Sequence, residues 1–316
     1  MSNPKITNSN NLNPVILLFI DGVGIGKNDP EFNPFFKYGF KTFTQFFGAV
    51  PTLDNPILKR NNGYIFPVDA RMGVEGFPQS GTGQTSIFCG INAPQFVGKH
   101  FGPYPYSTLI PVIKEKNIFT EFMRINKKPF FMNAYPKVFF DYIDSGKSRL
   151  SVTSLSASSA GLKFNSIEDV REGRALTAEI TGERWNIKLG YNLPILTSAQ
   201  AAQRLLHAAS IYDLVVYEYF LTDHLGHGRY DGNTQKTLAI LDDFLFTIFT
   251  EVDPSKYTVL LCSDHGNFED LSIKTHTLNP SLAIAYGKHA SFLFNQIKTL
   301  ADIKDSLLQI QTNNLI

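Results

Sequence analysis

The pattern of apolar and polar residues predicts a first buried strand at residues 15–20, where VILLFI runs without a polar break. Such runs are typical of strands that are covered on both faces of a parallel sheet. Similar short apolar runs predict strands at 64–69, 129–133, 214–217 and 257–262. Helical spacing of apolar residues predicts helices at 34–47, 81–90, 107–124, 198–208, 234–250 and 300–311. Because helices alternate with apolar strands, we expect an α/β fold with a mainly parallel sheet flanked by helices.

The pattern changes in the middle of the chain. Residues 134–196 contain polar, irregular stretches such as SVTSLSASSAG and EITGERWNIKLGYN. We therefore expect an α/β core formed by residues 1–133 and 197–316. Residues 134–196 are expected to form a small inserted cap or substrate-recognition segment.

Composition narrows the class of protein. The chain has 316 residues, of which 43% are hydrophobic and 18% charged, and a formal net charge of +1. This balance predicts neither a nucleic-acid partner nor a membrane partner, and it leaves the oligomeric state open. The polar start and the absence of a long apolar stretch predict a soluble, cytoplasmic protein. With only Cys89 and Cys262, both in apolar runs, we expect buried free thiols and no disulfide.

The stretch LLFIDGVGIGK has two interpretations. Glycines 22, 24 and 26 suggest a dinucleotide-binding loop, but that loop needs G-x-G-x-x-G leading into a helix. Here the glycines are followed by KNDP, which is a poor helix start, and no phosphate-binding G-x-x-x-x-G-K-[ST] is present. We therefore favour Asp21 as the functional residue and expect the glycines to let the backbone pass close to it.

Acidic residues and histidines follow three predicted strands. Asp21 ends the first, TDHLGHG follows the strand at 214–217, and SDHG ends the strand at 257–262. A further histidine lies in THT, and the chemically relevant set is Asp21, Asp223, His227, Asp264, His265 and His276. Any one histidine is most simply an ordinary core or surface residue. Parallel strands, however, bring their carboxyl ends to one edge, and Asp and His are preferred ligands of ions such as zinc and manganese.

These motifs carry a family resemblance. In chain order the sequence contains DGVG, QSGTGQTSIFCG, DHLGHG, SDHGNFED and THTLNP. This set resembles the alkaline phosphatase superfamily and is most similar to its branch of cofactor-independent phosphoglycerate mutase and phosphopentomutase. The resemblance covers the two outer parts of the chain, not the middle, and it implies an alkaline-phosphatase-like core. The mutases carry much larger inserted domains, which help to hold and reorient the substrate, so the short insertion argues against mutase activity.

The resemblance implies two sites for divalent metal ions, either zinc or manganese. The ligands that it implies for the first ion are Asp21, Ser80, Asp264 and His265. Those for the second ion are Asp223, His227 and His276. All seven positions hold residues of the types that the family uses.

The nucleophile is predicted to be Ser80. Register with the mutase pattern selects it among the hydroxyls of SGTGQTS, with Thr82 as the alternative. At a helix start, free backbone N–H groups and the helix dipole favour a phosphoryl group. A serine in a glycine loop is otherwise most simply a helix cap, so this assignment depends on the metal set.

These features predict a two-metal phosphoryl-transfer enzyme that acts on a small phosphomonoester, either as a phosphatase or in the manner of a phosphomutase. The alternatives left open are a phosphodiesterase or nucleotide pyrophosphatase, and a metal-holding, non-catalytic binding protein. A sulfatase is disfavoured because the C-x-P-x-R and S-x-P-x-R motifs are absent. The predicted substrate contacts are Lys99, His100, Tyr104 and Arg184, although these side chains are equally well explained as surface and packing residues. Asn267 is predicted either to orient a ligand or to end a turn.

Overall fold

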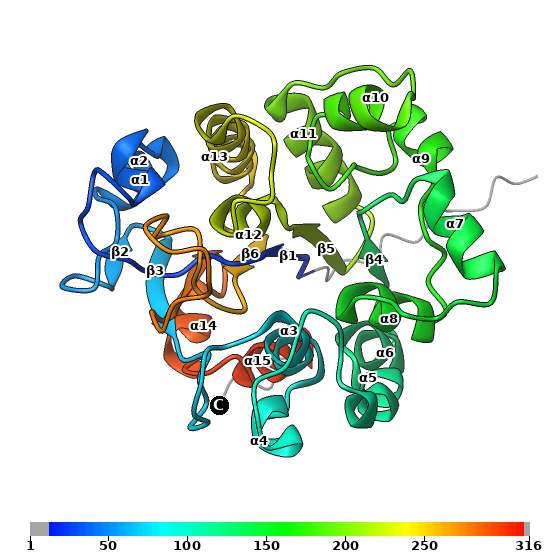
Figure 1. Cartoon of the computed structure of the whole chain (residues 1–316), viewed down its shortest axis with the longest axis horizontal. Coiled ribbons are helices and arrows are strands. Elements are labelled where there is room, and N and C mark those ends of the chain that lie inside the picture. The colour runs from blue at the N-terminus through cyan, green and yellow to red at the C-terminus, as the bar shows by residue number, and fades with distance from the viewer. Residues whose placement is uncertain (1–12, 313–316) are drawn as a thin grey trace, which may run out of the picture.

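The computed structural model describes residues 13–312 and contains a single seven-stranded sheet (Figure 1). Along the sheet the strands lie in the order β2-β3-β7-β6-β1-β5-β4. Their bounds are β1 Val15–Ile20, β2 Leu58–Arg60, β3 Gly63–Val68, β4 Pro129–Phe131, β5 Leu214–Tyr219, β6 Thr258–Cys262 and β7 Ser281–Gly287.

Four neighbouring strands, β6, β1, β5 and β4, run parallel, and β3 points the same way. β7 runs antiparallel between β6 and β3, and β2 is antiparallel to β3 at the edge. The predicted α/β class with a mainly parallel sheet is therefore confirmed. The prediction was incomplete, because it contained neither β2 nor β7.

Helices cover both faces of the sheet (Figure 1). One face carries α1 Pro34–Lys37, α2 Lys41–Phe47, α11 Ser198–Ala209 and α13 Thr234–Glu251. The other carries α3 Ser80–Cys89, α5 Ile110–Lys116, α6 Ile118–Arg124, α8 Val152–Ser159, α14 Ala290–Gln296 and α15 Asp302–Thr312. The remaining helices are α4 Ala93–Val97, η1 Ser107–Leu109, α7 Lys137–Asp144, α9 Ile167–Arg171, α10 Glu183–Leu189 and α12 Leu221–Gly226.

The central position of strand β1 in the sheet accounts for its continuous apolar sequence. Its six side chains are all buried, and they alternate between the two hydrophobic cores that lie on opposite faces of the sheet. Each fully buried aliphatic side chain contributes about 1.5–3 kcal/mol relative to exposure. β1 is thereby held rigidly between β5 and β6, and the residue that follows it is placed with little freedom.

Two predicted helices are interrupted. The helix predicted at 34–47 is divided between α1 and α2, because Gly39 adopts a positive φ of 78° between them. The helix predicted at 107–124 is divided among η1, α5 and α6. Asn117 has an extended backbone there, and its side chain accepts a hydrogen bond from Thr120 N, which starts α6.

The middle segment, residues 134–196, is less irregular than predicted, since it contains α7, α8, α9 and α10. α8 packs against α3, α5 and α6 and contributes to the hydrophobic core on that face. A separate small cluster contains Ala134, Val170, Ala175, Trp185 and Leu193. The role of this segment as a cap stays a prediction.

Cys89 and Cys262 are buried free thiols, as predicted. Both pack in the core on the α3 face of the sheet. Among residues 13–312, no helix has the length and apolar character needed to cross a membrane.

Candidate metal centre

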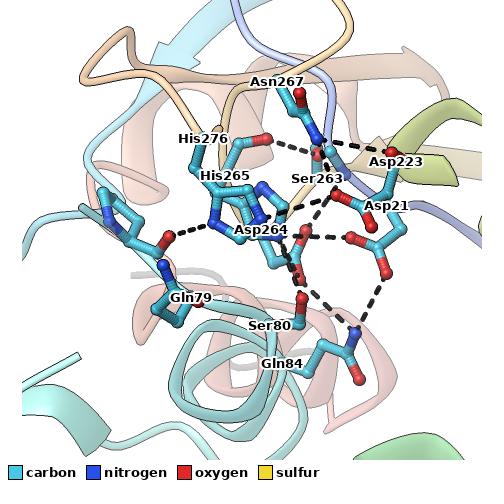
Figure 2. Close-up of polar contacts among 12 residues, drawn as sticks. Asp21, Gln79, Ser80, Gln84, Asp223, Ser263, Asp264, His265, Asn267 and His276 are labelled. Atoms are coloured by element: carbon cyan, nitrogen blue, oxygen red, sulfur yellow. Dashed lines mark hydrogen bonds and ion pairs between the residues drawn. The ribbon is translucent and has the colours of Figure 1, made fainter. Parts of the chain in front are cut away.

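The acidic residues predicted from the sequence meet at one edge of the sheet. Asp21 directly follows β1, Asp223 lies in α12 just beyond β5, and Asp264 follows β6. Because β1 pairs in parallel with both β5 and β6, the three strands end side by side. Figure 2 shows these carboxylates pointing toward one another, with Ser80 and two histidines beside them.

The first group consists of Asp21, Asp264 and His265, which are all buried and whose donor atoms lie within 4.8 Å of one another. His265 Nε2 lies 3.4 Å from Asp21 Oδ1 and 3.5 Å from Asp264 Oδ2. Ser80 Oγ lies 3.1 Å from the same nitrogen. The four residues that were predicted to surround the first ion are therefore together.

The second group consists of Asp223, His227 and His276, with the same mutual spacing limit of 4.8 Å. Asp223 Oδ1 lies 3.2 Å from His227 Nε2 and 3.5 Å from His276 Nε2. The imidazoles of His265 and His276 stack with centroids 3.7 Å apart, so the two groups are direct neighbours.

The histidines of the second group turn their Nε2 atoms toward one another. His276 Nδ1 donates to Pro78 O at 2.6 Å, and His227 Nδ1 donates to Lys274 O at 2.8 Å. In a neutral imidazole the other nitrogen is then an acceptor. Yet the two Nε2 atoms face each other at 3.0 Å, next to a carboxylate oxygen. The hydrogen bond to Asp223 raises the pKa of His227, so either a proton on Nε2 or a cation can occupy this space. With both imidazoles neutral, the three converging acceptors fit a bound cation.

The first group points to the same conclusion. Asp21 Oδ1 is buried without a hydrogen-bond partner among the described residues. Burial, together with the negative charges of Asp264 and Asp223, raises the pKa of Asp21 well above its usual range. A cation in this group would offset that repulsion. Carboxylate and imidazole donors suit zinc and manganese, and imidazole is a poorer match for magnesium.

Ser80 is the first residue of α3, and the glycines after it permit close packing. A side chain on Gly81 would come 2.1 Å from Tyr104 O, and one on Gly83 would come 3.0 Å from Asp264 Cβ. Gly81 therefore lets the loop of Tyr104 pack on the helix, and Gly83 lets the helix pack close to Asp264. Thr82, the alternative nucleophile, points elsewhere, since its hydroxyl donates to Gln79 O at 3.2 Å.

The glycines of the DGVG segment serve the same purpose. Gly22 has a positive φ of 70°, and a side chain there would come 3.0 Å from Asp223 Cα. A side chain on Gly24 would come 2.6 Å from Glu269 Oε1. These glycines therefore let the segment after Asp21 pass close to Asp223 and Glu269.

Two amide side chains contact the carboxylates. Asn267 Nδ2 donates to Asp223 Oδ1 at 2.9 Å, so this residue orients a candidate metal ligand. Gln84, which the sequence analysis missed, lies one helical turn after Ser80. Its Nε2 is 3.4 Å from both Asp21 Oδ2 and Asp264 Oδ2 (Figure 2). The signal in the sequence was that Gln84 follows Ser80 by four residues at the start of a predicted helix, because residues at this spacing lie on the same helix face.

Glu269 was also missed, and it joins three loops of the site. Its Oε2 accepts hydrogen bonds from Gly24 N and Asn267 N, both at 2.8 Å. Its Oε1 accepts from Thr277 Oγ1 at 2.5 Å and from Asn279 Nδ2 at 2.9 Å. The buried carboxylate thus connects the loops that carry Asp21, His265 and His276.

Glu218 is a third carboxylate that the sequence analysis missed. It lies on β5, is 8% exposed, and accepts a hydrogen bond from Thr153 Oγ1 at 2.7 Å. Burial, with a contribution from the charge of Asp264, raises its pKa to about 7 despite that hydrogen bond. An acidic residue inside an otherwise apolar strand was the signal in the sequence.

The predicted substrate contacts are not gathered in one place. Lys99 Nζ lies over the rings of Phe101 and Tyr106, and Tyr104 follows in the same loop. His100 Nε2 instead lies 3.3 Å from Val74 O. Arg184 pairs with Asp231 at 2.9 Å and lines a separate cavity of about 290 Å³.

Comparison with known proteins identifies a family model described as the Metalloenzyme superfamily, which matches residues 180–314. The 2,3-bisphosphoglycerate-independent phosphoglycerate mutase of Coxiella burnetii is 30% identical over 106 residues, which are 31% of this chain and 20% of that protein. The enzyme of the same name from Ehrlichia canis is 27% identical over 100 residues, or 28% of this chain and 20% of that protein. The match therefore spans about a fifth of these curated relatives.

Solved structures share the fold. A magnesium-bound variant of TAB5 alkaline phosphatase, an enzyme from an Antarctic bacterium, aligns with a TM-score of 0.52 at 14% identity, covering 95% of this chain and 98% of that one. A protein from Pyrococcus horikoshii aligns with a TM-score of 0.51 at 13% identity, covering 87% and 85%.

Glu269→Gln is expected to weaken metal binding by about tenfold and to lower the free energy of unfolding by about 2 kcal/mol. The variant retains the size of the side chain but cannot accept all four hydrogen bonds, so the three loops lose their shared anchor. Manganese titration and urea unfolding measure the two effects. The matched control is Glu251→Gln, at an exposed position in α13. Unchanged manganese affinity in Glu269→Gln would show that the anchor is dispensable.

Glu218→Gln is expected to stabilise the metal-free protein at high pH only. The ordinary pKa of this carboxyl is 4.5 and its pKa in the folded protein is about 7, so the folded state binds the extra proton between these values. Stability of the wild type therefore falls as the pH rises through this window. Glu218→Gln does not titrate, so it avoids this loss in the free energy of unfolding, which reaches about 3 kcal/mol above pH ~8 in the wild type. Urea unfolding at low and high pH measures it, and a difference that does not depend on pH contradicts the assignment.

Proposed function

We propose that this chain, which matches a metalloenzyme family model over residues 180–314 and shares its fold with an alkaline phosphatase, is a member of the alkaline phosphatase superfamily and a two-metal phosphoryl-transfer enzyme with Ser80 as its nucleophile. The proposed substrate is a small phosphomonoester. The acceptor is water in a phosphatase reaction, or a second substrate hydroxyl in a mutase-like one.

The observation that carries this proposal is the pair of adjacent Asp/His groups next to one serine hydroxyl. Asp21, Asp264 and His265 would hold one ion, and Asp223, His227 and His276 the other. When bound, two such ions lower the pKa of a nucleophile and neutralise the developing charge on a transferred phosphoryl group.

The residues of the chain would arrange the substrate as follows. The amides of Ser80 and Gly81 donate no hydrogen bond among the described residues, whereas those of Thr82 and Gly83 donate to Phe101 O and Gln79 O. Together with the helix dipole, the two free amides favour a phosphate beside Ser80. Ser80 Oγ lies 3.1 Å from His265 Nε2, so the hydroxyl is next to the first group of candidate metal ligands.

The reaction would proceed through a phosphoserine. Attack by Ser80 Oγ forms an oxygen–phosphorus bond and breaks the bond from phosphorus to the substrate oxygen. The hydroxyl proton of Ser80 passes to solvent, and the substrate oxygen takes up a proton from solvent and leaves as the alcohol. Water or a second hydroxyl then attacks the phosphorus and releases Ser80. Gln84 would hold the carboxylate of Asp21 in position during both steps, and Asn267 would hold that of Asp223.

The test is phosphate release from small phosphomonoesters with manganese or zinc supplied to metal-free protein. We expect metal-dependent release that falls by about three orders of magnitude in Ser80→Ala. Ser86→Ala, in the same helix but bonded to Thr82 O, is the matched control and should retain activity. Turnover by Ser80→Ala at the wild-type rate would exclude the serine route. A phosphorylated Ser80 peptide, identified by mass spectrometry after rapid quenching, would support it directly.

A further inference from the structure

A cavity of about 990 Å³ lies between α5, α7, α8 and the loop of residues 101–107. Its aromatic wall consists of Phe101, Tyr104, Tyr106, Phe140 and Phe164. Its cationic side chains are Lys114, Lys147, Arg149 and Lys163, whereas Asp144 is the one carboxylate among its lining residues. Cavities of roughly 300–1,000 Å³ are typical of sites for organic ligands.

The loop that forms one wall of this cavity packs on the first turn of α3. Thr82 N donates to Phe101 O at 2.9 Å. Position 81 has no room for a side chain, because Tyr104 O and Phe101 O would lie 2.1 and 2.7 Å from it. The wall is therefore held in a fixed position relative to Ser80, the residue before Gly81.

The cations of the cavity are not neutralised by the protein. Among residues 13–312, none of the four cationic side chains that line the cavity forms an ion pair. By contrast, Arg184 in the smaller cavity is paired with Asp231. The Arg149 guanidinium instead lies 4.2 Å from the centroid of the ring of Tyr104, the residue whose carbonyl oxygen packs against Gly81 of α3.

We propose that this cavity binds the alcohol part of the phosphomonoester, and that this part carries an aromatic ring and a second anionic group. This inference rests on the proposed function and names the substrate class for the same site. The aromatic wall provides stacking surfaces, and the unpaired cations complement a negative charge. A three-carbon phosphate ester would use neither feature and would fill little of the volume.

The experiment compares two substrates of the metal-loaded enzyme, adenosine 3′,5′-bisphosphate and glycerol 2-phosphate. The first has an aromatic ring and a second phosphate, and the second has neither. We expect wild-type kcat/KM to be at least about tenfold higher for the bisphosphate. Arg149→Met should remove most of that preference through a higher KM, and Tyr104→Ala should do likewise. Arg171→Met, at an exposed position paired with Glu168, is the control and should preserve the preference.

Equilibrium binding separates this proposal from the proposed function. Calorimetric titration of the manganese-loaded Ser80→Ala protein with adenosine 3′,5′-bisphosphate needs no turnover. Weaker binding after Arg149→Met in that background supports the cavity, even if the enzyme hydrolyses neither ester and the proposed function fails. Hydrolysis of both esters without preference, and with no effect of Arg149→Met on binding, would overturn the cavity proposal while leaving the phosphoryl-transfer function intact.

Discussion

Buried negative charge is the constraint on which the rest of this structure depends. Three aspartates, at positions 21, 223 and 264, are brought together where three parallel strands end, and all are buried. Removing carboxylates from water without a counter-charge costs several kcal/mol per group. Within residues 13–312, imidazoles and side-chain amides surround these aspartates, and no lysine or arginine pairs with them. A site of this kind reaches a low energy when cations occupy it.

The fold tolerates this concentration of charge because its surroundings are rigid. β1 is buried on both faces, and Glu269 connects the loops after β1 and β6 to the loop before β7. Glycines at positions 22, 24, 81 and 83 allow backbone segments to approach closer than side chains would permit. Stability from the hydrophobic cores thus offsets the cost of an assembled polar centre, as is common at functional sites.

The central strand and the convergence of the Asp and His side chains were predictable from the sequence. β1 was predicted with its observed bounds because a doubly buried strand leaves a continuous apolar run. The Asp and His positions stood at strand ends, so their convergence followed from parallel pairing. Their grouping was implied by family resemblance, and the geometry is compatible with it, although metal binding itself is still a prediction.

The failures of prediction come from contacts that are distant in sequence. β7 was missed because it follows β6 through a loop and pairs antiparallel with it, so no helix separates the two as the alternating pattern requires. Glu269 gains its role from partners on three loops, and Glu218 from Thr153 on α8, which no local pattern reveals. The separation of α5 from α6 depends on a single cap, Asn117, inside an otherwise helical pattern.

The measurement that most directly tests the two-metal centre is the metal stoichiometry of the purified chain. Metal-free protein is titrated with manganese and the bound ions are counted by calorimetry and electron paramagnetic resonance. We expect two ions per chain, with magnetic coupling between them because the two groups are neighbours. Substitution of His276 by alanine should abolish the coupling and leave one ion tightly bound. Protein that binds no ion, or a single ion that is unaffected by changes in either group, would contradict the central claim.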